Sequence, residues 1–247
     1  MLPLWQLYDK LYDQPDSIKA VTKDGDINLS NVTEFRNVKW FRAKRSSRVI
    51  KLPIKMTDDL AYFLGVIVGD GYVKKLKRKK GGYYWEIIIT GRMDYIEYLS
   101  KLTSSLFNYI PTVTKDKRRG NSYILRISSM IIFRYLTRIF GFCSGEKSGN
   151  IPKIKFVYDS SYLFKNFLAG LIDTDGYINS KYAALIQKDR KFLEIIRLKS
   201  EELLGFKFSK TLVNRRINDH IVGWWIITRD VKRLNNLIPL RYRYVPW

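Results

Sequence analysis

A repeated pattern is the feature that most constrains how this chain can fold. Residues 60–73 read LAYFLGVIVGDGYV, and residues 164–178 read FKNFLAGLIDTDGYI. Each segment is an apolar run with helical spacing and small residues, and each ends in Asp-Gly-Tyr followed by a β-branched residue. Self-similarity at a fixed distance along a chain is typical of a duplicated structural unit. We therefore expect two copies of one supersecondary unit.

The elements predicted after each copy follow the same order. After the first copy we expect a strand, an amphipathic helix, two strands and a helix, at residues 87–90, 94–107, 111–115, 122–128 and 130–140. After the second copy the corresponding elements are at residues 183–187, 191–204, 208–214, 221–228 and 230–237. Each half is then helix, hairpin, helix, hairpin, helix. This order predicts an α+β fold with two antiparallel sheets.

Composition changes along the chain predict where these halves begin and end. The predicted parts are an N-terminal extension of unassigned role, a first half, a linker and a second half, at residues 1–50, 51–140, 141–157 and 158–247. The linker is placed where Gly, Ser and Pro accumulate, since these residues interrupt regular structure. Within the extension, residues 2–12 and 32–42 are predicted to be helical, with a tight turn at Asp24-Gly25.

The charge balance indicates a polyanionic partner. The chain has 45 Lys and Arg against 23 Asp and Glu, a formal net charge of +22. Nucleic acid and an anionic membrane surface are the two common partners of such a protein. The apolar run at residues 60–68 is too short to cross a bilayer, and the first twelve residues lack the basic start of a secretory leader. We expect an intracellular protein without a membrane partner, cytoplasmic in a prokaryote, with an organelle as the alternative.

The residue types present limit how a metal could be bound. Cys143 and His220 are the single cysteine and the single histidine of the chain. Thiolate or multi-histidine zinc centres are therefore excluded. A metal would be held by oxygen ligands, and this favours ions of the Mg²⁺ type.

The two Asp-Gly endings are the candidate catalytic positions. One such ending is weak evidence, because Gly is the favoured residue after a helix. In a duplicated fold, however, the two motif helices would meet at a pseudo-twofold axis, where the small residues Gly65, Gly69, Ala169 and Gly170 would allow close approach. Asp70 and Asp175 would then lie side by side. Two neighbouring carboxylates repel each other unless a cation lies between them.

The motif itself resembles a known family signature. Residues 168–176 read LAGLIDTDG, which differs from LAGLIDADG only at Thr174, and residues 63–71 read FLGVIVGDG, a degenerate copy. Over about residues 55–245 the chain thus resembles the LAGLIDADG homing endonucleases of the single-chain, two-motif type. The first motif is convincing mainly because the second exists.

This resemblance implies specific roles for the motif residues. The last acid of each motif, Asp70 and Asp175, would bind catalytic Mg²⁺, helped by the carbonyls of Gly69 and Thr174. In this family Ca²⁺ is expected to bind without supporting cleavage, and Mn²⁺ to substitute for Mg²⁺. The first Asp of the motif is usually not a metal ligand. Val68 in the first copy, where the second has Asp173, therefore leaves the catalytic interpretation intact.

Polar and basic residues after the motifs resemble the accessory catalytic groups of the family. Gln187 and Lys188 follow the second motif, and Thr90 and Arg92 are at the matching place in the first half. Further candidates are Arg126 and Lys181. Each of these is equally compatible with a plain phosphate contact. The reaction implied is Mg²⁺-dependent hydrolysis of both DNA strands at a long asymmetric target by a monomer encoded in an intron, leaving short 3′ overhangs.

Basic residues in the predicted hairpins are the candidate DNA contacts. Family members bind DNA over two saddle-shaped sheets, and Lys and Arg in the hairpin turns would neutralise phosphates. The residues expected to contact DNA are Tyr72, Lys74, Lys75, Lys77, Arg78, Lys79, Lys80, Arg92, Lys115, Lys117, Arg118, Arg119, Arg126, Lys181, Lys210, Asn214, Arg215 and Arg216. Strand residues such as Glu86 and Trp225 could also contact bases, depending on the strand register.

Three other interpretations are compatible with the sequence. The same fold could serve as a maturase that binds intron RNA, since RNA is as anionic as DNA. It could also serve as a non-catalytic DNA-binding regulator, or the chain could be an unrelated basic protein that binds RNA or a membrane surface. The presence of both Asp70 and Asp175 favours the nuclease, because binding alone does not require them.

Overall fold

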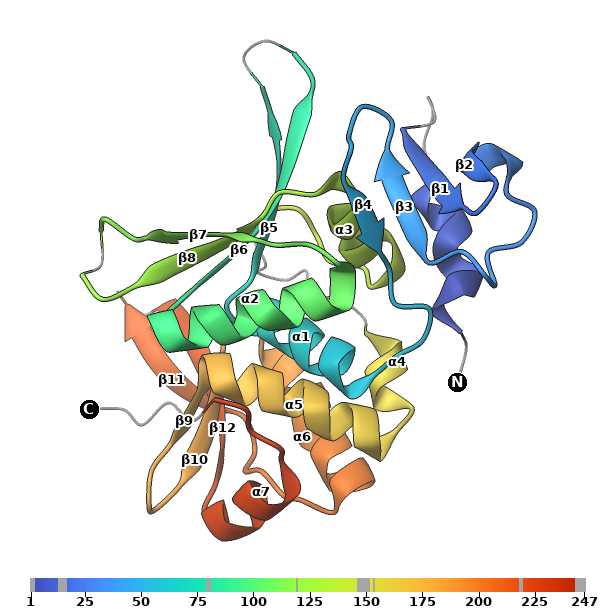
Figure 1. Cartoon of the computed structure of the whole chain (residues 1–247). Helices are drawn as coiled ribbons and strands as arrows, with labels where there is room; N and C mark the ends of the chain where they lie inside the picture. Colours follow the sequence, from blue (N-terminus) through green and yellow to red (C-terminus); the bar gives the residue numbers. More distant parts are fainter. Residues whose placement is uncertain are drawn as a thin grey trace. The chain divides into compact units, whose positions relative to one another are not determined.

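The structure is a computed structural model in which the chain divides into two units (Figure 1). It describes residues 3–12, 17–78, 81–118, 120–145, 152, 154–217 and 220–242. Unit 1 comprises Met1–Met56 and Gly71–Lys147, and unit 2 comprises Thr57–Asp70 and Ser148–Trp247. The helix of the first motif therefore belongs to the same unit as the helix of the second.

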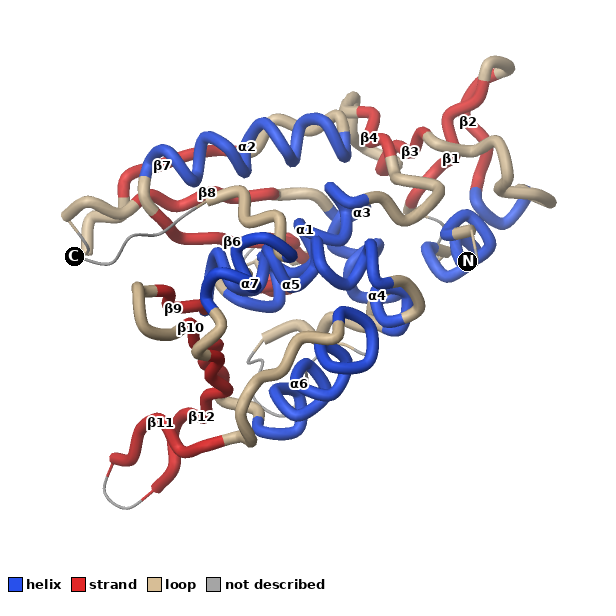
Figure 2. The backbone as a smooth tube through the Cα atoms, turned by 90° about the horizontal axis from the view of Figure 1, so that it is seen from below, coloured by secondary structure: helices blue, strands red, loops and turns tan. Residues whose placement is uncertain are grey.

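The N-terminal part of unit 1 is a four-stranded antiparallel sheet with a 3₁₀ helix packed on it (Figures 1 and 2). The elements are η1 (Leu4–Leu11), β1 (Ile18–Thr22), β2 (Gly25–Asn28), η2 (Leu29–Asn31), β3 (Trp40–Ala43) and β4 (Val49–Lys51), with strand order β2-β1-β3-β4. Tyr8 of η1 packs edge-on against Phe41 of β3, with ring centroids 5.3 Å apart. The helix predicted over residues 32–42 is wrong, since this segment is irregular up to β3.

The rest of unit 1 contains the strands and helices that follow the first motif. Its elements are β5 (Tyr72–Lys77), β6 (Tyr83–Gly91), α2 (Met93–Phe107), β7 (Thr112–Lys115), β8 (Tyr123–Ile127), α3 (Met130–Arg134) and the π-helical turn η3 (Tyr135–Ile139). Helix α2 contacts β6 and β8 through its buried stripe, which includes Ile96 and Leu99. It ends at Asn108, whose φ of 50° lies in the left-handed region that Asn tolerates at a helix end.

Unit 2 contains both motif helices and the second copy of the sheet. Its elements are α1 (Asp58–Gly69), α4 (Lys155–Tyr158), α5 (Ser161–Asp175), β9 (Gly176–Ile178), β10 (Ala183–Gln187), α6 (Arg190–Leu204), β11 (Leu212–Ile217), β12 (His220–Thr228) and α7 (Val231–Leu237). The strand orders β5-β6-β8-β7 and β9-β10-β12-β11 have the same connectivity. This equivalence confirms the predicted α+β duplication.

Helices α1 and α5 form the centre of unit 2. Every residue of α1 from Leu60 to Val68 is buried, as expected of a helix that is apolar on all sides. Both helices begin at a hydroxyl cap, because Thr57 accepts a hydrogen bond from the Leu60 amide and Ser160 accepts one from the Leu163 amide. The two helices lie side by side (Figure 1), and in the chain α1 is followed by β5 and α5 by β9.

Candidate metal and nucleic-acid site

The two motif helices are in backbone contact at one glycine of each. A Cβ atom on Gly65 of α1 would collide with the carbonyl oxygen of Phe167 in α5, and would lie 3.0 Å from a second main-chain atom of that helix. A Cβ atom on Gly170 of α5 would collide in the same way with the carbonyl oxygen of Tyr62 in α1. The contact is thus reciprocal, and only glycine allows this approach. The predicted role of Gly65 and Gly170 is consistent with this geometry.

The close approach continues to the C-terminal ends of both helices. Gly69 is the last residue of α1, and Asp70 caps the helix by donating its backbone N–H to the Val66 carbonyl at 3.0 Å. Thr174 and Asp175 are the last residues of α5. A Cβ atom on Gly69 would collide with Oγ1 of Thr174 and would lie 3.2 Å from Oδ2 of Asp175. The four residues expected to bind metal are therefore gathered at two adjoining helix ends.

Gln187 brings a further predicted residue to the same place. Its side-chain amide donates a hydrogen bond to Oδ2 of Asp175. Gln187 is the last residue of β10, the second strand after the motif. Lys188 follows immediately and is exposed.

This donor set fits a hard divalent cation. The helix C-termini carry partial negative charge, and the two carboxylates add to it, within a chain whose net charge is +22. In the described part of the chain, no three or more His, Cys, Asp or Glu side chains form a metal-binding group. Two carboxylates supplemented by main-chain carbonyls and water are the ligands that Mg²⁺ commonly takes. The residues present therefore fit the predicted ion.

Asp173, the first acid of the second motif, has a different environment from Asp175. It is 8% exposed, and its Oδ2 accepts hydrogen bonds from the Tyr62 hydroxyl at 2.8 Å and from the backbone N–H groups of Arg241 at 2.9 Å and Tyr242 at 3.0 Å. Burial raises the pKa of Asp173 from 3.8 to about 6, although these hydrogen bonds and the Arg241 charge act in the opposite direction. Asp173 anchors the segment after α7.

The raised pKa of Asp173 has a consequence for stability. Between the unfolded pKa of 3.8 and the folded pKa of about 6, the unfolded chain loses the proton that the folded chain retains. The contribution of Asp173 to the free energy of unfolding is therefore fully present below pH 3.8 and is lost as the pH rises to about 6. The fall amounts to roughly 3 kcal/mol at 1.36 kcal/mol per pKa unit.

Arg241 is a residue that the sequence did not indicate. Its guanidinium group contacts the Asp59 carboxylate near the start of α1 and the Asn166 side-chain oxygen of α5, at 3.4 Å for the latter. It also lies 4.5 Å from the centroid of the Tyr62 ring. The C-terminal segment thus joins both motif helices. Because 182 residues separate Arg241 from Asp59, no local pattern could have revealed this contact.

The register of β5–β8 determines which predicted DNA contacts share a face. Tyr72 is paired with Ile88, which is paired with Arg126, and Lys74 is paired with Glu86. These side chains lie on the face opposite to the buried residues of the sheet. Glu86 bridges the two basic groups, with its Oε2 3.0 Å from Nζ of Lys74 and 3.7 Å from Nη1 of Arg126. Tyr72, Lys74 and Arg126 therefore lie together on one face of the sheet.

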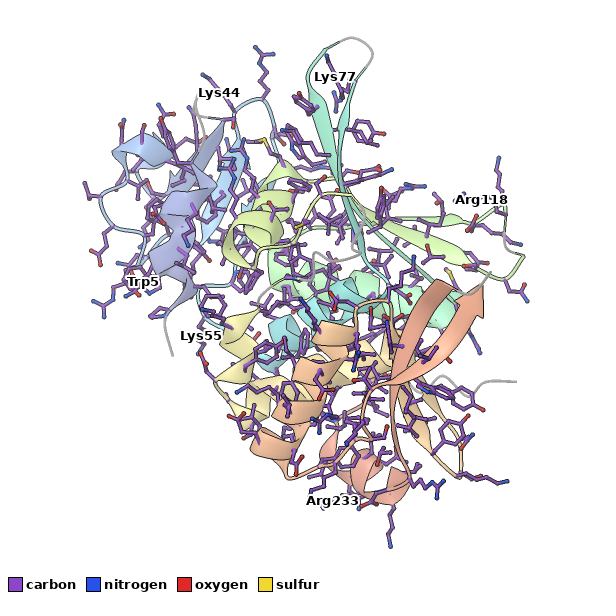
Figure 3. The ribbon with its side chains drawn as sticks, turned by 180° about the vertical axis from the view of Figure 1, so that it is seen from behind. Trp5, Lys44, Lys55, Lys77, Arg118 and Arg233 are labelled. Atoms are coloured by element: carbon purple, nitrogen blue, oxygen red, sulfur yellow. The ribbon has the colours of Figure 1, made fainter. Side chains whose placement is uncertain are left out.

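The remaining basic candidates of unit 1 are distributed over the hairpins. Lys75 and Lys77 have the opposite strand parity, and Nζ of Lys75 lies 4.2 Å from the Tyr83 ring centroid. Figure 3 shows Lys77 on the long β5–β6 hairpin and Arg118 in the β7–β8 turn. Exposed residues elsewhere in these hairpins or at the start of α2 are Arg78, Arg92, Lys115 and Lys117. Lys79, Lys80 and Arg119 lie outside the described residues.

The candidates of unit 2 lie at the turns and the edge of its sheet. Lys181 is in the β9–β10 turn, Lys210 precedes β11, and Asn214 lies where the pairing of β11 with β12 shifts register; all three are exposed. Arg215 and Arg216 belong to β11, but their side chains lie outside the described part of the chain. Trp225 is half-buried on β12, opposite Ile186.

Among the residues that the structure describes, no helix has the length and apolar character needed to span a bilayer.

Sequence comparisons relate the chain to three proteins of Methanocaldococcus jannaschii. No family model matches the chain. Two uncharacterized proteins of Methanocaldococcus jannaschii are 25% and 24% identical over 189 and 203 residues, covering 75% and 78% of this chain. The matches span 62% and 68% of those two proteins, so the chain covers less than two thirds of the first. The glutamine–fructose-6-phosphate aminotransferase of the same organism is 26% identical over 137 residues, which are 11% of that protein.

Comparison with solved structures gives a consistent fold. A variant of I-DmoI in complex with its target DNA and manganese matches with a TM-score of 0.58 and 20% identity, covering 75% of this chain and 98% of that one. I-DmoI with DNA and calcium matches with a TM-score of 0.51 and 22% identity over 74% of this chain and 93% of that one. The I-LtrWI LAGLIDADG homing endonuclease bound to target DNA has a TM-score of 0.50 and 12% identity, covering 75% and 85%.

These likenesses establish the fold of the chain. The order of elements, the two equivalent sheets and the packing of α1 on α5 are those of the LAGLIDADG homing endonucleases. The resemblance predicted from the motifs is thus confirmed at the level of the fold.

Proposed function

We propose that this protein is a metal-dependent, site-specific DNA endonuclease that cuts both strands of a long asymmetric target as a monomer. The observation that carries the proposal is the meeting of the α1 and α5 ends, where a Cβ atom on Gly69 would lie 3.2 Å from Oδ2 of Asp175. Two acids from two equivalent helices are the arrangement needed to serve two strands. Short 3′ overhangs and an intron-encoded origin belong to the same proposal.

The proposed ligands are Asp70 and Asp175, with the main-chain carbonyls of Gly69 and Thr174. A bound Mg²⁺ or Mn²⁺ ion would lower the pKa of a water molecule and stabilise charge on the phosphoryl oxygens. The chain's own contribution is positioning. Gln187 holds the Asp175 carboxylate by donating to Oδ2, and the glycine contacts keep the two helix ends together. Ca²⁺ would occupy the same ligands without supporting cleavage. Lys188 is exposed beside Gln187, where it could approach a phosphate.

The proposed DNA-binding surface includes the open face of the β5–β8 sheet. Tyr72, Lys74 and Arg126 lie on this face, and Glu86 bridges the two basic side chains there. Lys and Arg would neutralise phosphates without reading the sequence. The hairpin residues Lys77 and Arg118 would neutralise further phosphates beyond the sheet. Duplex DNA bound in this way should dissociate as the salt concentration rises.

The test is cleavage of a randomised duplex library by the full chain with Mg²⁺ and with EDTA. We expect cutting at one long sequence with Mg²⁺, and loss of cutting in Asp70→Asn and in Asp175→Asn, while both variants keep DNA affinity within about threefold because the basic face is unchanged. Asp159→Asn is the matched control, since Asp159 is exposed and precedes the opposite end of α5.

Two outcomes would contradict the proposal. Cleavage at the wild-type rate by Asp175→Asn would exclude a shared metal at these acids. The absence of any cutting, together with tight binding of structured RNA, would instead favour the maturase that the sequence left open.

A further inference from the structure

The N-terminal sheet has an open face whose composition the proposed nuclease site does not explain. Strands β1, β3 and β4 direct Ile18, Ala20, Phe41 and Ile50 to one side, where all four are buried. Because side chains alternate along a strand, the residues between them lie on the opposite side. Trp40, on that opposite side, is 38% exposed, which is unusual for so large an apolar ring.

The strand register places basic side chains around this tryptophan. Trp40 is paired with Lys51 on one side and with Val21 on the other. In the next row, Arg42 is paired with Lys19. Residues paired across an antiparallel ladder lie on the same face within about 5 Å of one another. The exposed indole ring therefore has Lys51 beside it in its own row, which ends at Asp26, and Arg42 and Lys19 in the next row.

The charge of the surrounding segment supports an anionic ligand. Residues 17–56 contain ten Lys and Arg against three Asp and Glu. Asp26 forms an ion pair with Arg42 at 3.4 Å and offsets one of these charges. Lys39, Lys44 and Lys55 are further exposed cations of this segment, and Lys44 and Lys55 are labelled in Figure 3.

We propose that this face, consisting of Lys19, Trp40, Arg42 and Lys51, binds single-stranded nucleic acid. A base can stack on an exposed aromatic ring only when it has left a duplex stack, whereas the basic groups beside it bind phosphates of any strand. An exposed Trp40 ring, on which a base can stack, with cationic side chains nearby thus favours an unpaired strand over a duplex. This site would act independently of Asp70 and Asp175.

The opposite side of the sheet offers matched controls. Helix η1 covers the buried face, where Tyr8 contacts Phe41, and η1 carries Trp5 and Lys10 away from the open face. Trp5→Ala therefore removes a tryptophan, and Lys10→Ala a cation, from the same part of the chain without touching the proposed site. Trp5 is labelled in Figure 3.

The experiment is fluorescence anisotropy of the full chain with labelled twelve-nucleotide dT, rU and duplex DNA probes, in EDTA, over a series of KCl concentrations. Trp40→Ala should weaken binding of the single strands about tenfold or more, the size expected for one lost stacking contact. Trp40→Phe should restore most of this affinity, and Trp5→Ala should remain within twofold of wild type. Duplex binding should be unchanged by Trp40→Ala.

The salt series separates stacking from phosphate binding. The double variant Lys19→Ala/Lys51→Ala should reduce the slope of log K against log salt by about 1.4, at about 0.7 for each single-strand phosphate contact, while Trp40→Ala leaves the slope unchanged. Comparison of dT with rU shows whether the strand is DNA or RNA. Unchanged single-strand affinity in Trp40→Ala, or an equal loss with duplex, would overturn the proposal. Circular dichroism of each variant verifies that the fold is intact.

Discussion

Replacing either contact glycine by alanine tests the packing on which the site depends. In Gly65→Ala the new methyl group would meet the Phe167 carbonyl, and in Gly170→Ala it would meet the Tyr62 carbonyl. These atoms belong to helical backbone and cannot rotate aside, so the helices must separate by about 1 Å. Overpacking of this kind costs up to about 3 kcal/mol. Alanine regains about 1 kcal/mol through its helix propensity, which leaves a net loss of roughly 2 kcal/mol.

The loss of activity should exceed the loss of stability. A separation of about 1 Å at Gly65 would also move the end of α1 away from Asp175, and displacements of that size can cost about 100-fold in rate. Stability would be measured by urea unfolding followed by circular dichroism, and activity by cleavage of the selected target. The double variant Gly65→Ala/Gly170→Ala should cost less than the sum of the two single variants, since one separation accommodates both methyl groups.

Gly120→Ala serves as the control for this series. Gly120 lies in the β7–β8 turn, and no described atom lies within 4 Å of a Cβ built there. The Gly120→Ala substitution should change neither the free energy of unfolding nor the cleavage rate. If Gly65→Ala unfolded at the same urea concentration as Gly120→Ala and cleaved as fast as wild type, the helices could not be in backbone contact at Gly65, and the reasoning would be refuted.

Three further changes have definite expected outcomes. Asp173→Asn should abolish the fall in stability between about pH 4 and pH 6. The free energy of unfolding of this variant, obtained from urea unfolding, should therefore rise relative to that of wild type by up to roughly 3 kcal/mol across this range. A difference that stays constant with pH would exclude titration of Asp173. Gln187→Ala should slow cleavage about 10- to 100-fold with unchanged duplex affinity, as measured in single-turnover assays, because Asp175 loses its amide donor. Arg126→Ala should lower the salt slope of duplex binding by about 0.9, whereas Lys101→Ala on the exposed side of α2 should not.

The duplication was predictable from the sequence because each repeated element is recognised from residues that are close together in the chain. An apolar helix, a terminating Asp-Gly and alternating strands each depend on near neighbours, and their repetition fixes the order of elements. For the same reason the sequence predicted that Asp70 and Asp175 lie at the ends of helices. Asp70 caps α1 and Asp175 ends α5, as the pattern predicted.

The N-terminal sheet was not predictable in this way. Its strands have three to five residues, too few to separate a period of 2 from a period of 3.6, and for this reason the pattern of residues 32–42 wrongly predicts a helix. The sheet is specified by contacts distant in sequence, such as that between Tyr8 and Phe41. The strand register likewise depends on pairing across the sheet. Only the register places Trp40 beside Lys51 and Tyr72 on the same face as Arg126.

The difference between the two motif copies has a structural reason. Val68 and Asp173 occupy equivalent positions in the repeat, and both are buried. At Asp173 the buried oxygen accepts the backbone N–H groups of Arg241 and Tyr242, so the acid there anchors the segment that follows α7. Helix α1 is followed by β5, and a second buried carboxylate at position 68 would carry a desolvation cost. The carboxylate of Asp173 therefore serves to hold these two backbone groups, and the valine at position 68 has no bearing on the role proposed for Asp70.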